Sequence, residues 1–479
     1  MQPTPAPLTR DAGRTLTEQL ALRYADRIRQ RLLAPGARLP SVRECARHHG
    51  VSPHTVVAAY DQLLAQGLIE ARQQRGYFVR TPAAAAAPRP GAVADVSPAE
   101  RLAAPLNAAA LIRGMFHRES ARPAPGLGAL PPDWLDLPAL AAALRRVSLG
   151  DRLAPLALQY GEPAGDMRLR AALSVRLAEV GIAAPPAQIV TTVGATHAVD
   201  VVSRTLLAPG DAVLVDEPGW AVEFARLERM GMRILPVPRG IDGPDLEAMR
   251  ALVAAHRPRL YITVSVLHNP TGLSLAAAHA HQVLRLAEQA DFHIVEDDTY
   301  TWLASAHSPR LSALDGLGRT IYVSGFSKIL APNWRIGFIA ASPALVDRFI
   351  DTKLLSTLTT PALLEQAIGV TLEQGLLRRH VERVRTRLDA ARARSVALAE
   401  AAGCAPVTPP RGLFAWVDTG VDTDRLAQSL LDAGWLIAPG SLFHASHRPS
   451  TLMRINVATS QDAAFWKALD AARRGLRRR

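Results

Sequence analysis

The apolar positions along the chain follow two different patterns, and the difference predicts two domains. In residues 15–33, leucine and isoleucine recur at helical spacing. From Pro125 onward, short continuous apolar runs such as LYITVSVL, FHIV and TIYVSG alternate with helical segments. That alternation is typical of a three-layer α/β domain. We therefore expect a small helical domain followed by a large α/β domain.

Residues 41–67 carry the start and stop signals of two successive helices. Ser41 and Ser52 are expected N-cap residues, Gly50 supplies the turn between the helices, and Gly67 ends the second one. The second helix is expected to present one apolar face, made of Val56, Val57, Tyr60, Leu63 and Leu64.

Residues 68–71 and 77–79 then alternate as a small hairpin around Gln74, Arg75 and Gly76. A helix, a helix–turn–helix and a hairpin in this order make a winged helix–turn–helix, whose second paired helix enters a major groove of DNA. A small helical bundle without a ligand is the alternative, against which the hairpin and the local charge argue.

The positive charge of the chain is concentrated at its N-terminal end. The net charge is +12 over 479 residues, and residues 1–80 hold twelve arginines against six acidic residues. This sixth of the chain therefore carries half of the excess charge, which favours a polyanionic partner for this segment. Residues 81–118, rich in proline and alanine, are expected to be a linker.

The composition excludes several other classes of protein. A length of 479 residues with 48% hydrophobic and 20% charged residues is typical of a globular protein of two or three domains. No apolar run reaches the roughly 18 residues of a membrane span, and the N-terminus has no signal-peptide core. Cys45 and Cys404 have neither disulfide nor metal-site spacing, so we expect reduced thiols, no metal site and a cytoplasmic location.

Lysine is scarce in this chain, and one of the three lysines stands where its chemistry matters. The lysines are Lys328, Lys353 and Lys467, and every other basic side chain of the Lys/Arg type is arginine. A lysine amine forms a Schiff base with an aldehyde, which arginine does not. Arg335 follows Lys328 by seven residues, on the predicted loop between two buried strands, and its guanidinium suits a phosphate. An aldehyde beside a phosphate is the chemistry of pyridoxal 5′-phosphate (PLP). The alternative is an ordinary loop lysine at a strand end.

The N-terminal segment resembles the GntR family of bacterial regulators. The shared residues are Gly36, Leu39, Pro40, Ser41, Arg43, Val51, Ser52, Thr55 and Val56. The resemblance implies that DNA is contacted by Arg43, Ser52, His54 and Thr55, with Arg75 and Gly76 in the wing. Two positions depart from the family pattern: Cys45 replaces a leucine, and Pro53 replaces an arginine that is implied to contact DNA.

Three motifs in the rest of the chain resemble those of fold-type-I aminotransferases. They are HNPTG at residues 268–272, EDDTY at 296–300 and SGFSK at 324–328 followed by Arg335, in the family's order. The resemblance implies a PLP site in which Lys328 carries the cofactor. The other cofactor-binding residues that it implies are Ala195, Thr196, Trp220, Asn269, Asp297, Tyr300, Ser327 and Arg335. Gly325 stands where the family often has serine or threonine, so one phosphate hydroxyl is expected to be missing.

Chemistry gives each of the remaining candidates a role. A buried carboxylate keeps the pyridine nitrogen protonated, and we expect Asp297 to supply it, because the rival Asp298 faces the other way on the strand. The resemblance implies that Tyr160 reaches the cofactor phosphate of a partner subunit. It also implies that Arg454 clamps the α-carboxylate of a substrate or effector.

A GntR-type reader joined to an aminotransferase-like domain resembles the MocR subgroup of bacterial regulators. This plan predicts a winged helix–turn–helix at residues 10–80, the linker, and a PLP-binding domain of fold type I with a smaller C-terminal α+β part at 119–479. It implies a cytoplasmic, head-to-tail homodimer that binds duplex DNA and senses PLP, or an amine or amino acid that forms an aldimine with PLP. The alternatives are an active transaminase with a DNA-binding domain and a sensor of free PLP.

Overall fold

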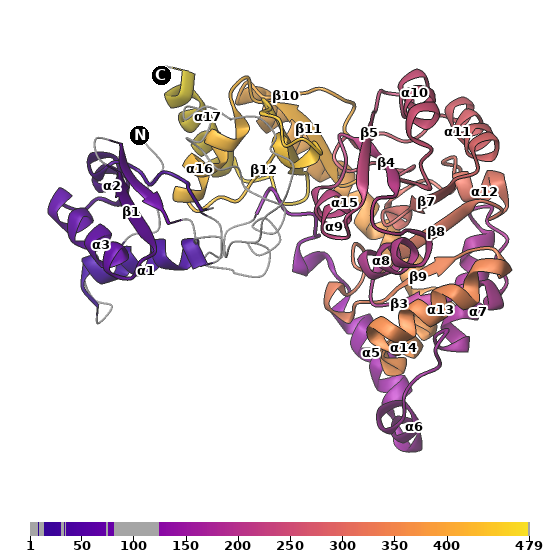
Figure 1. Ribbon diagram of the computed structural model, residues 1–479. Helices are drawn as coiled ribbons and strands as arrows, with labels where there is room; N and C mark the ends of the chain where they lie inside the picture. Colours follow the sequence, from indigo (N-terminus) through magenta and orange to yellow (C-terminus); the bar gives the residue numbers. More distant parts are fainter. Residues whose placement is uncertain are drawn as a thin grey trace.

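The structure is a computed structural model that describes residues 14–29, 35–72, 75–80 and 124–477, together with Leu8 and Leu33. The linker predicted at residues 81–118 lies outside the described residues, so its boundaries stay a prediction. Figure 1 shows the yellow C-terminal part of the chain between the indigo N-terminal part and the large α/β part.

The N-terminal domain has the elements that the sequence predicts. They are α1 (Leu16–Arg29), α2 (Val42–His49), α3 (Pro53–Ala65), β1 (Ile69–Arg72) and β2 (Gly76–Val79). Ser41 caps α2 by accepting a hydrogen bond from the amide of Glu44, and Ser52 caps α3 by accepting one from the amide of Thr55. Strands β1 and β2 pair in antiparallel fashion as the wing.

One side of α3 forms the core of this domain. Val56, Tyr60 and Leu63 are completely buried against α1, and the Tyr60 hydroxyl donates to the carbonyl of Pro40. The prediction that Val57 shares this face was wrong, since Val57 is 38% exposed. One residue along a helix turns the side chain by about 100°, so Val57 points away from the face that Val56 occupies.

The large domain is built on a mixed sheet of seven strands. The strands are β3 (Ile189–Thr192), β4 (Ala212–Glu217), β5 (Arg233–Pro238), β6 (Leu260–Thr263), β7 (His293–Asp297), β8 (Thr320–Gly325) and β9 (Gly337–Ala340), in the order β3-β9-β8-β7-β6-β4-β5. Strand β9 runs antiparallel to both of its neighbours, β3 and β8, and the other neighbouring pairs in this sheet are parallel. The chain therefore turns sharply between β8 and β9, and that turn contains Lys328.

Helices cover both faces of this sheet, as the sequence predicts for a three-layer domain. The helices of the large domain are η1 (Pro132–Trp134), α5 (Leu137–Ser148), η2 (Gly150–Arg152), α6 (Leu153–Leu158), α7 (Met167–Ala178), η3 (Pro186–Gln188), α8 (Ala195–Leu206), α9 (Ala221–Arg229), α10 (Leu246–His256), α11 (Ala277–Ala290), η4 (Thr301–Leu303), α12 (Leu311–Asp315), η5 (Pro332–Trp334), α13 (Pro343–Thr357) and α14 (Ala362–Glu373). Helices α8, α9 and α13 pack on one face, and α10 and α11 on the other. The parallel strands β4, β6, β7 and β8 end at the same edge, where such sheets bind ligands.

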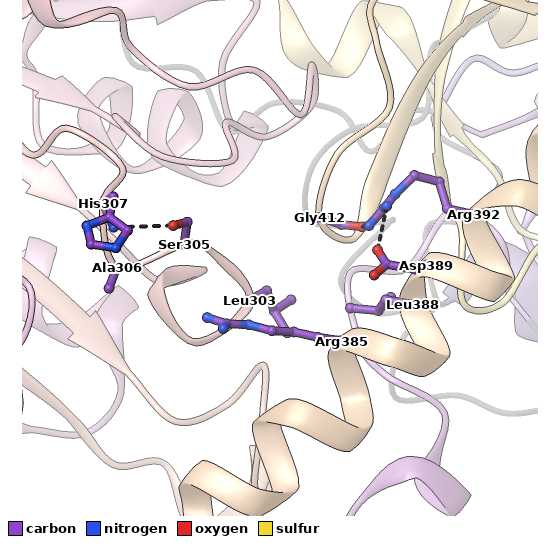
Figure 2. A pocket seen from close by; sticks show the side chains of 9 residues that line it. All are labelled: Leu303, Ser305, Ala306, His307, Arg385, Leu388, Asp389, Arg392 and Gly412. Carbon is purple, nitrogen blue, oxygen red and sulfur yellow. Dashed lines mark hydrogen bonds and ion pairs between the residues drawn. The ribbon is translucent and has the colours of Figure 1, made fainter.

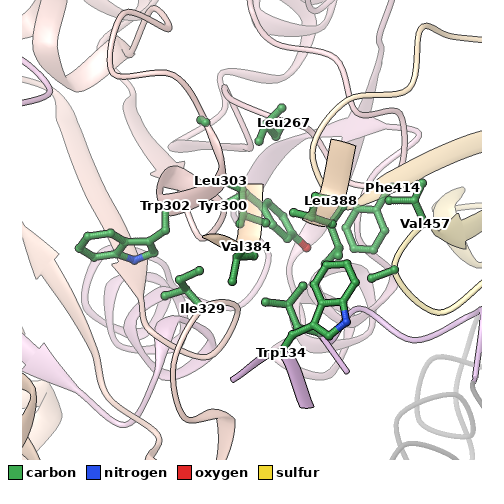
Figure 3. Packing of buried hydrophobic residues seen from close by; sticks show 14 of the residues in the cluster. Trp134, Leu267, Tyr300, Trp302, Leu303, Ile329, Val384, Leu388, Phe414 and Val457 are labelled. Atoms are coloured by element: carbon green, nitrogen blue, oxygen red, sulfur yellow. The ribbon is translucent and has the colours of Figure 1, made fainter. Parts of the chain in front are cut away.

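The small domain follows the long helix α15 (Leu376–Ala401). Its antiparallel sheet has the order β10-β11-β13-β12. The remaining elements are β10 (Ala405–Pro406), β11 (Phe414–Asp418), α16 (Thr423–Asp432), β12 (Ala438–Pro439), η6 (Gly440–Phe443), β13 (Leu452–Asn456) and α17 (Ala463–Arg477). One continuous apolar core joins this domain to the large domain, with Tyr300 and Phe414 side by side in it (Figure 3). The two parts are therefore packed together rather than merely tethered.

A buried ion pair attaches the N-terminal domain to the small domain. The Nη1 atom of Arg27 lies 2.7 Å from Oδ1 of Asp432, and Nη2 donates to the carbonyl of Leu431 at 3.2 Å. The two side chains are only 6% and 16% exposed. Asp432 and Leu431 form the C-terminal end of α16, where a cation also interacts favourably with the helix dipole.

We expect Arg27→Met to release the N-terminal domain from α16 while both domains stay folded, because methionine keeps the apolar stem and loses both hydrogen bonds. Small-angle scattering should show a larger radius of gyration for this variant. Arg29→Met is the matched control, since Arg29 makes an exposed pair with Asp26 on the same helix. An unchanged radius in Arg27→Met would show that the pair does not hold the domains together.

Candidate functional site

Lys328 lies in the turn after β8, at the carboxyl edge of the sheet. Its Nζ donates a hydrogen bond to the carbonyl of Gly128 at 2.7 Å. Burial and the nearby Arg454 guanidinium lower the pKa of Lys328 to about 8. An amine with this pKa is partly neutral in slightly alkaline solution, and the neutral form attacks a carbonyl carbon.

Arg335 and the start of α8 form an anion cradle beside this lysine. Nη1 of Arg335 donates to the Ser327 hydroxyl at 3.1 Å. No side chain caps α8, so the amides of Ala195 and Thr196 have no partner within the helix. A Cβ at Gly194 would stand 2.5 Å from Nη2 of Arg335, and the φ of 80° at this position favours glycine. A guanidinium, a hydroxyl and helix N-terminal amides together fit a phosphate group.

The missing hydroxyl at Gly325 has a packing explanation. A Cβ at Gly325 would meet the carbonyl oxygen of Ile336 at 3.1 Å and the amide of Ala195 at 3.5 Å. A Cβ at Gly337, the residue paired with Gly325, would clash with the carbonyl carbon of Gly194 at 2.5 Å. Strands β8 and β9 therefore approach the start of α8 through glycine backbone, and little space remains there for a side chain.

A small pocket lies at the ends of β4, β6 and β7. Trp220, Asn269 and Asp297 line it, together with Gly219 and Glu223. Burial raises the pKa of Asp297 to about 6, although the amide and hydroxyl of Thr299 both donate to its Oδ1. The second oxygen, Oδ2, has no protein donor among the described residues. The pocket thus contains an aromatic ring that can stack on a planar ligand and a carboxylate that can stabilise a cationic ring nitrogen.

Asp298 is engaged elsewhere. Its Oδ2 lies 2.5 Å from Nε of Arg310 and accepts a hydrogen bond from the Tyr322 hydroxyl at 2.9 Å. Both members of the Asp298–Arg310 pair are completely buried. The two adjacent acids therefore have separate environments, one in the pocket and one in a buried ion pair.

Arg454, on β13, places its guanidinium over two aromatic rings and close enough to Lys328 to lower its pKa. The guanidinium carbon lies 4.4 Å from the ring centre of Phe414 and 5.1 Å from that of Phe443. Nη1 donates to the side-chain oxygen of Asn269 at 2.8 Å, and Nη2 to the carbonyl of Gly126 at 2.6 Å. Burial lowers the pKa of Arg454 to about 10, and its buried Nε has no hydrogen-bond partner in the described part of the chain.

Tyr300 joins the same group. Its side chain is 6% exposed, and its ring meets the edge of Phe414 at 5.5 Å. Burial raises the pKa of its hydroxyl, while the Arg454 cation and a hydrogen bond with Asn269 act in the opposite direction. The structure thus brings together Lys328, Asn269, Asp297, Tyr300 and Arg454, with the Arg335 cradle next to Lys328.

One wall of this site, the segment of residues 124–130, did not emerge from the sequence. Its backbone carbonyls at Gly126 and Gly128 accept hydrogen bonds from Arg454 and Lys328. Asn456 fixes the segment by donating to the carbonyls of Leu127 and Ala129. Backbone acceptors leave no signature in side-chain chemistry, and the repeated glycines of this segment were the only available signal.

Tyr160 lies away from the pocket in the single chain. It follows α6, and its side chain is 83% exposed. Its predicted role at the site of a partner subunit stays a prediction.

The predicted DNA-contacting residues lie at the surface of the N-terminal domain. Arg43, Ser52, His54, Arg75 and Gly76 are exposed, and Thr55 is half-buried. The hydroxyls of Ser52 and Thr55 hydrogen-bond each other at 2.8 Å, so both also serve the cap of α3. Arg38 was not among the predicted residues, yet its Nε lies 3.6 Å from the Cβ position of Gly76 in the wing.

A cavity of about 400 Å³, larger than the pocket that contains Trp220 and Asp297, lies elsewhere in the protein. Figure 2 shows its lining of Leu303, Ser305, Ala306, His307, Arg385, Leu388, Asp389, Arg392 and Gly412. Arg385 donates to the carbonyls of Trp302 and Ala304, and Arg392 pairs with Asp389 at 2.8 Å. The cavity contains none of the residues that the sequence predicts for the cofactor site.

Comparison with known proteins assigns both halves of the chain. Residues 132–471 match the family model "Aminotransferase class I and II", and residues 16–79 match "Bacterial regulatory proteins, gntR family". In the part of the chain that the structure describes, no helix has the length and apolar character needed to cross a membrane.

Relatives share the whole arrangement. The HTH-type transcriptional regulator YdcR of Escherichia coli (strain K12) is 30% identical over 92% of this chain and 94% of its own length. The probable rhizopine catabolism regulatory protein MocR of Rhizobium meliloti is 30% identical over 79% of this chain and 76% of its own.

A solved structure supports the fold of the larger part. It is LysN, the α-aminoadipate aminotransferase of Thermus thermophilus, complexed with N-(5′-phosphopyridoxyl)-L-leucine. Its TM-score is 0.70 at 25% identity, with 77% of this chain and 95% of LysN covered. The chain belongs to the MocR-type regulators of the GntR family, in which a winged helix–turn–helix precedes an aminotransferase class I and II domain.

Proposed function

We propose that this protein is a PLP-dependent transcriptional regulator that responds to an amine or amino acid. The family relationship supports PLP as the cofactor, and LysN, which shares the fold, binds a phosphopyridoxyl amino acid. When bound, PLP supplies an aldehyde and an electron-accepting ring. We expect Lys328 to attach to the aldehyde.

Each group of the cofactor has a partner of suitable chemistry in this proposal. Ser327, Arg335 and the amides at Ala195 and Thr196 hold the phosphate. Trp220 stacks on the ring, and Asp297 keeps the ring nitrogen protonated. Asn269 and Tyr300 donate to the ring oxygen. These assignments rest on chemistry and on the family resemblance, and the uncapped amides at the start of α8, beside Arg335, support them.

The single observation that carries the effector proposal is the buried charge of Arg454. Its guanidinium donates to an amide oxygen and a backbone carbonyl, and among the described residues no carboxylate lies within ion-pair distance of it. A buried cation without an anion is costly, and a bidentate α-carboxylate would remove that cost. The effector is therefore expected to carry both an amine, for the cofactor aldehyde, and a carboxylate, for Arg454.

A series of direct contacts leads from Arg454 to the DNA-binding domain. Phe443, under Arg454, belongs to η6, and Ser441 of the same turn donates to Asp424 at 2.7 Å. Asp424 lies in the first turn of α16, and Asp432 at its other end pairs with Arg27. A shift of η6 on effector binding would thus act through α16 on the orientation of α1. Such a shift changes DNA affinity only as far as the effector prefers one arrangement.

The protein is expected to act as a cytoplasmic head-to-tail homodimer, with one winged helix on each half of its operator. The alternative function is transamination, which the assembled Lys328, Asp297 and Arg454 favour. A keto-acid acceptor assay with candidate amino acids separates the two. Spectral change without keto-acid turnover identifies a sensor, and turnover identifies an enzyme.

We expect PLP to bind covalently to the wild type and not to Lys328→Ala, with uptake that accelerates as pH rises through about 8. The neutral amine is the nucleophile, and Lys328 is protonated below its pKa of about 8. Stopped-flow absorbance of the yellow band between about pH 6.5 and 9.5 measures this profile. A colourless wild type would remove the cofactor proposal, and a flat profile would remove the role of the lowered pKa.

Substitutions of the adjacent acids Asp297 and Asp298 should affect different properties, PLP binding in one case and folding stability in the other. Asp297→Asn is expected to weaken PLP binding with little change in stability. Asp298→Asn should destabilise the fold by about 3 kcal/mol, because it leaves Arg310 buried without its partner. Thermal unfolding of the apoprotein and PLP titration give the two rankings. If Asp298→Asn harms PLP binding more than stability, the roles are reversed.

DNA binding and the response to amines should likewise be affected by different substitutions. Arg43→Ala is expected to weaken operator binding about tenfold or more and to leave PLP uptake intact. Lys328→Ala should keep basal DNA binding and lose the response to amines. Gel-shift titrations of both variants, with and without amines and at several salt concentrations, provide the test. A normal amine response in Lys328→Ala would contradict the sensor mechanism.

A further inference from the structure

Lys353 is a buried lysine that the proposed cofactor chemistry does not use. Its side chain is 0% exposed, and so is that of Glu365 on the neighbouring helix α14. Burial lowers the pKa of Lys353 to about 8, while the Glu365 carboxylate acts in the opposite direction. Lys353 and Glu365 are therefore two opposite charges buried outside the proposed cofactor pocket. Burying such charges is costly, so we ask which groups they bind.

Both charges hold the same stretch of backbone, residues 160–166. Nζ of Lys353 donates to the carbonyl of Pro163 at 2.8 Å. Oε2 of Glu365 accepts a hydrogen bond from the amide of Asp166 at 2.9 Å. One end of this 160–166 loop carries the exposed Tyr160, and the other is the N-cap of α7.

The loop also has almost no freedom to shift against Thr191 of β3. The Thr191 amide donates to the carbonyl of Ala164 at 2.9 Å, and Nζ of Lys353 reaches the Thr191 hydroxyl at 3.4 Å. A Cβ at Gly165, where φ is 102°, would lie 1.9 Å from that hydroxyl. Lys353, Glu365 and Thr191 therefore hold the buried side of the 160–166 loop in place.

The outer side of the same region is apolar and exposed. Tyr160 is 83% exposed and Leu158 is 82% exposed. Leu355 is 92% exposed, and it lies on α13 only two residues after Lys353. Helix α13 thus holds the loop with an inward charge and exposes Leu355 on its opposite side. Exposed apolar side chains such as Tyr160, Leu158 and Leu355 are expected where a second protein surface packs.

We propose that Lys353 and Glu365 are positioning residues that hold the 160–166 loop so that Tyr160 reaches the cofactor phosphate of a second copy of this chain. The inference rests on the proposed function, because it needs both the cofactor and the dimer. It predicts that the effect of Lys353 is exerted on the partner's site and not on its own.

Mixed dimers test this placement, because Lys328→Ala removes the covalent cofactor band from one chosen subunit. In the first dimer, one chain carries Lys353→Met and the other Lys328→Ala. The coloured site lies on the Lys353→Met chain and receives its loop from a chain with Lys353 intact. In the second dimer, one chain is wild type and the other carries both substitutions, so the coloured site receives the defective loop.

We expect wild-type PLP affinity in the first mixed dimer and about tenfold weaker affinity in the second, the cost of losing a hydrogen bond to a charged group. Hydrogen exchange of the amides at 161–166 should also accelerate in the Lys353→Met chain. Lys467→Met, which removes an exposed lysine, is the control and should leave both measurements unchanged. If the Lys353→Met chain does not fold, Lys353→Met/Glu365→Gln replaces it, since removing both charges leaves neither uncompensated.

The opposite ranking of the two dimers, or equal affinities, would overturn the proposal. So would a Tyr160→Phe dimer with wild-type affinity, because Lys353 is inferred to act through Tyr160. Either result leaves the proposed function standing, provided that the wild type binds PLP and DNA. A wild type that never takes up PLP would instead remove the proposed function.

Discussion

The site is organised around positive charge that is kept out of water without enough negative charge to balance it. Burial lowers the pKa of Lys328, Arg335 and Arg454, and the Asp297 carboxylate acts on Lys328 in the opposite direction. The other two carboxylates of the neighbouring pocket, Asp216 and Glu223, pair with Arg239 and Arg226 instead. Dehydrating a cation without a partner opposes folding. Ligands that bring anions would therefore relieve this cost, and the positions of the cations indicate where those anions would bind. One anion belongs at the Arg335 cradle and another at Arg454.

Asp297, an anion next to these cations, also indicates which charges a ligand would carry. Asp297 has a raised pKa because burial disfavours its anion, and a cation beside it would reverse that shift. A ligand with two anionic ends and a cationic ring satisfies all three positions at once. A phosphorylated pyridine joined to an amino acid has this distribution of charge. The electrostatics of the protein alone thus point to the ligand class that the family relationship also implies.

Sequence was informative about this site wherever a side chain of distinctive chemistry directly follows a buried strand. Asp297 and Lys328 both fall at the ends of neighbouring parallel strands, so the fold brings them to one edge. The alternation of side chains along a strand is also enough to separate Asp297 from Asp298, because it depends only on their adjacent positions. Helix ends were predictable for the same local reason, since Ser41 and Ser52 accept hydrogen bonds from amides three residues further along the chain.

Sequence failed where the contact depends on tertiary structure. The carbonyls of Gly126 and Gly128 reach Arg454 and Lys328 only after the chain has folded, and the pair Arg27–Asp432 joins residues about four hundred positions apart. The burial of Lys353 was equally invisible, because a lysine in a helix is ordinarily solvated. The sequence motifs therefore identify the reactive side chains, whereas the contacts that orient those side chains form only when distant segments pack together.

The position of α16 shows why a regulator can be built from an aminotransferase fold with few changes. In the small domain, Asp424 of this helix accepts a hydrogen bond from Ser441 of η6, and Asp432 at its other end pairs with Arg27 of the N-terminal domain. A helix of ten residues transmits a displacement from one end to the other because its backbone hydrogen bonds make it stiff. What remains adjustable is the packing at each end. In the proposed mechanism, the free energy of the response would be set by the difference in effector affinity between two arrangements of η6, and not by the strength of effector binding itself.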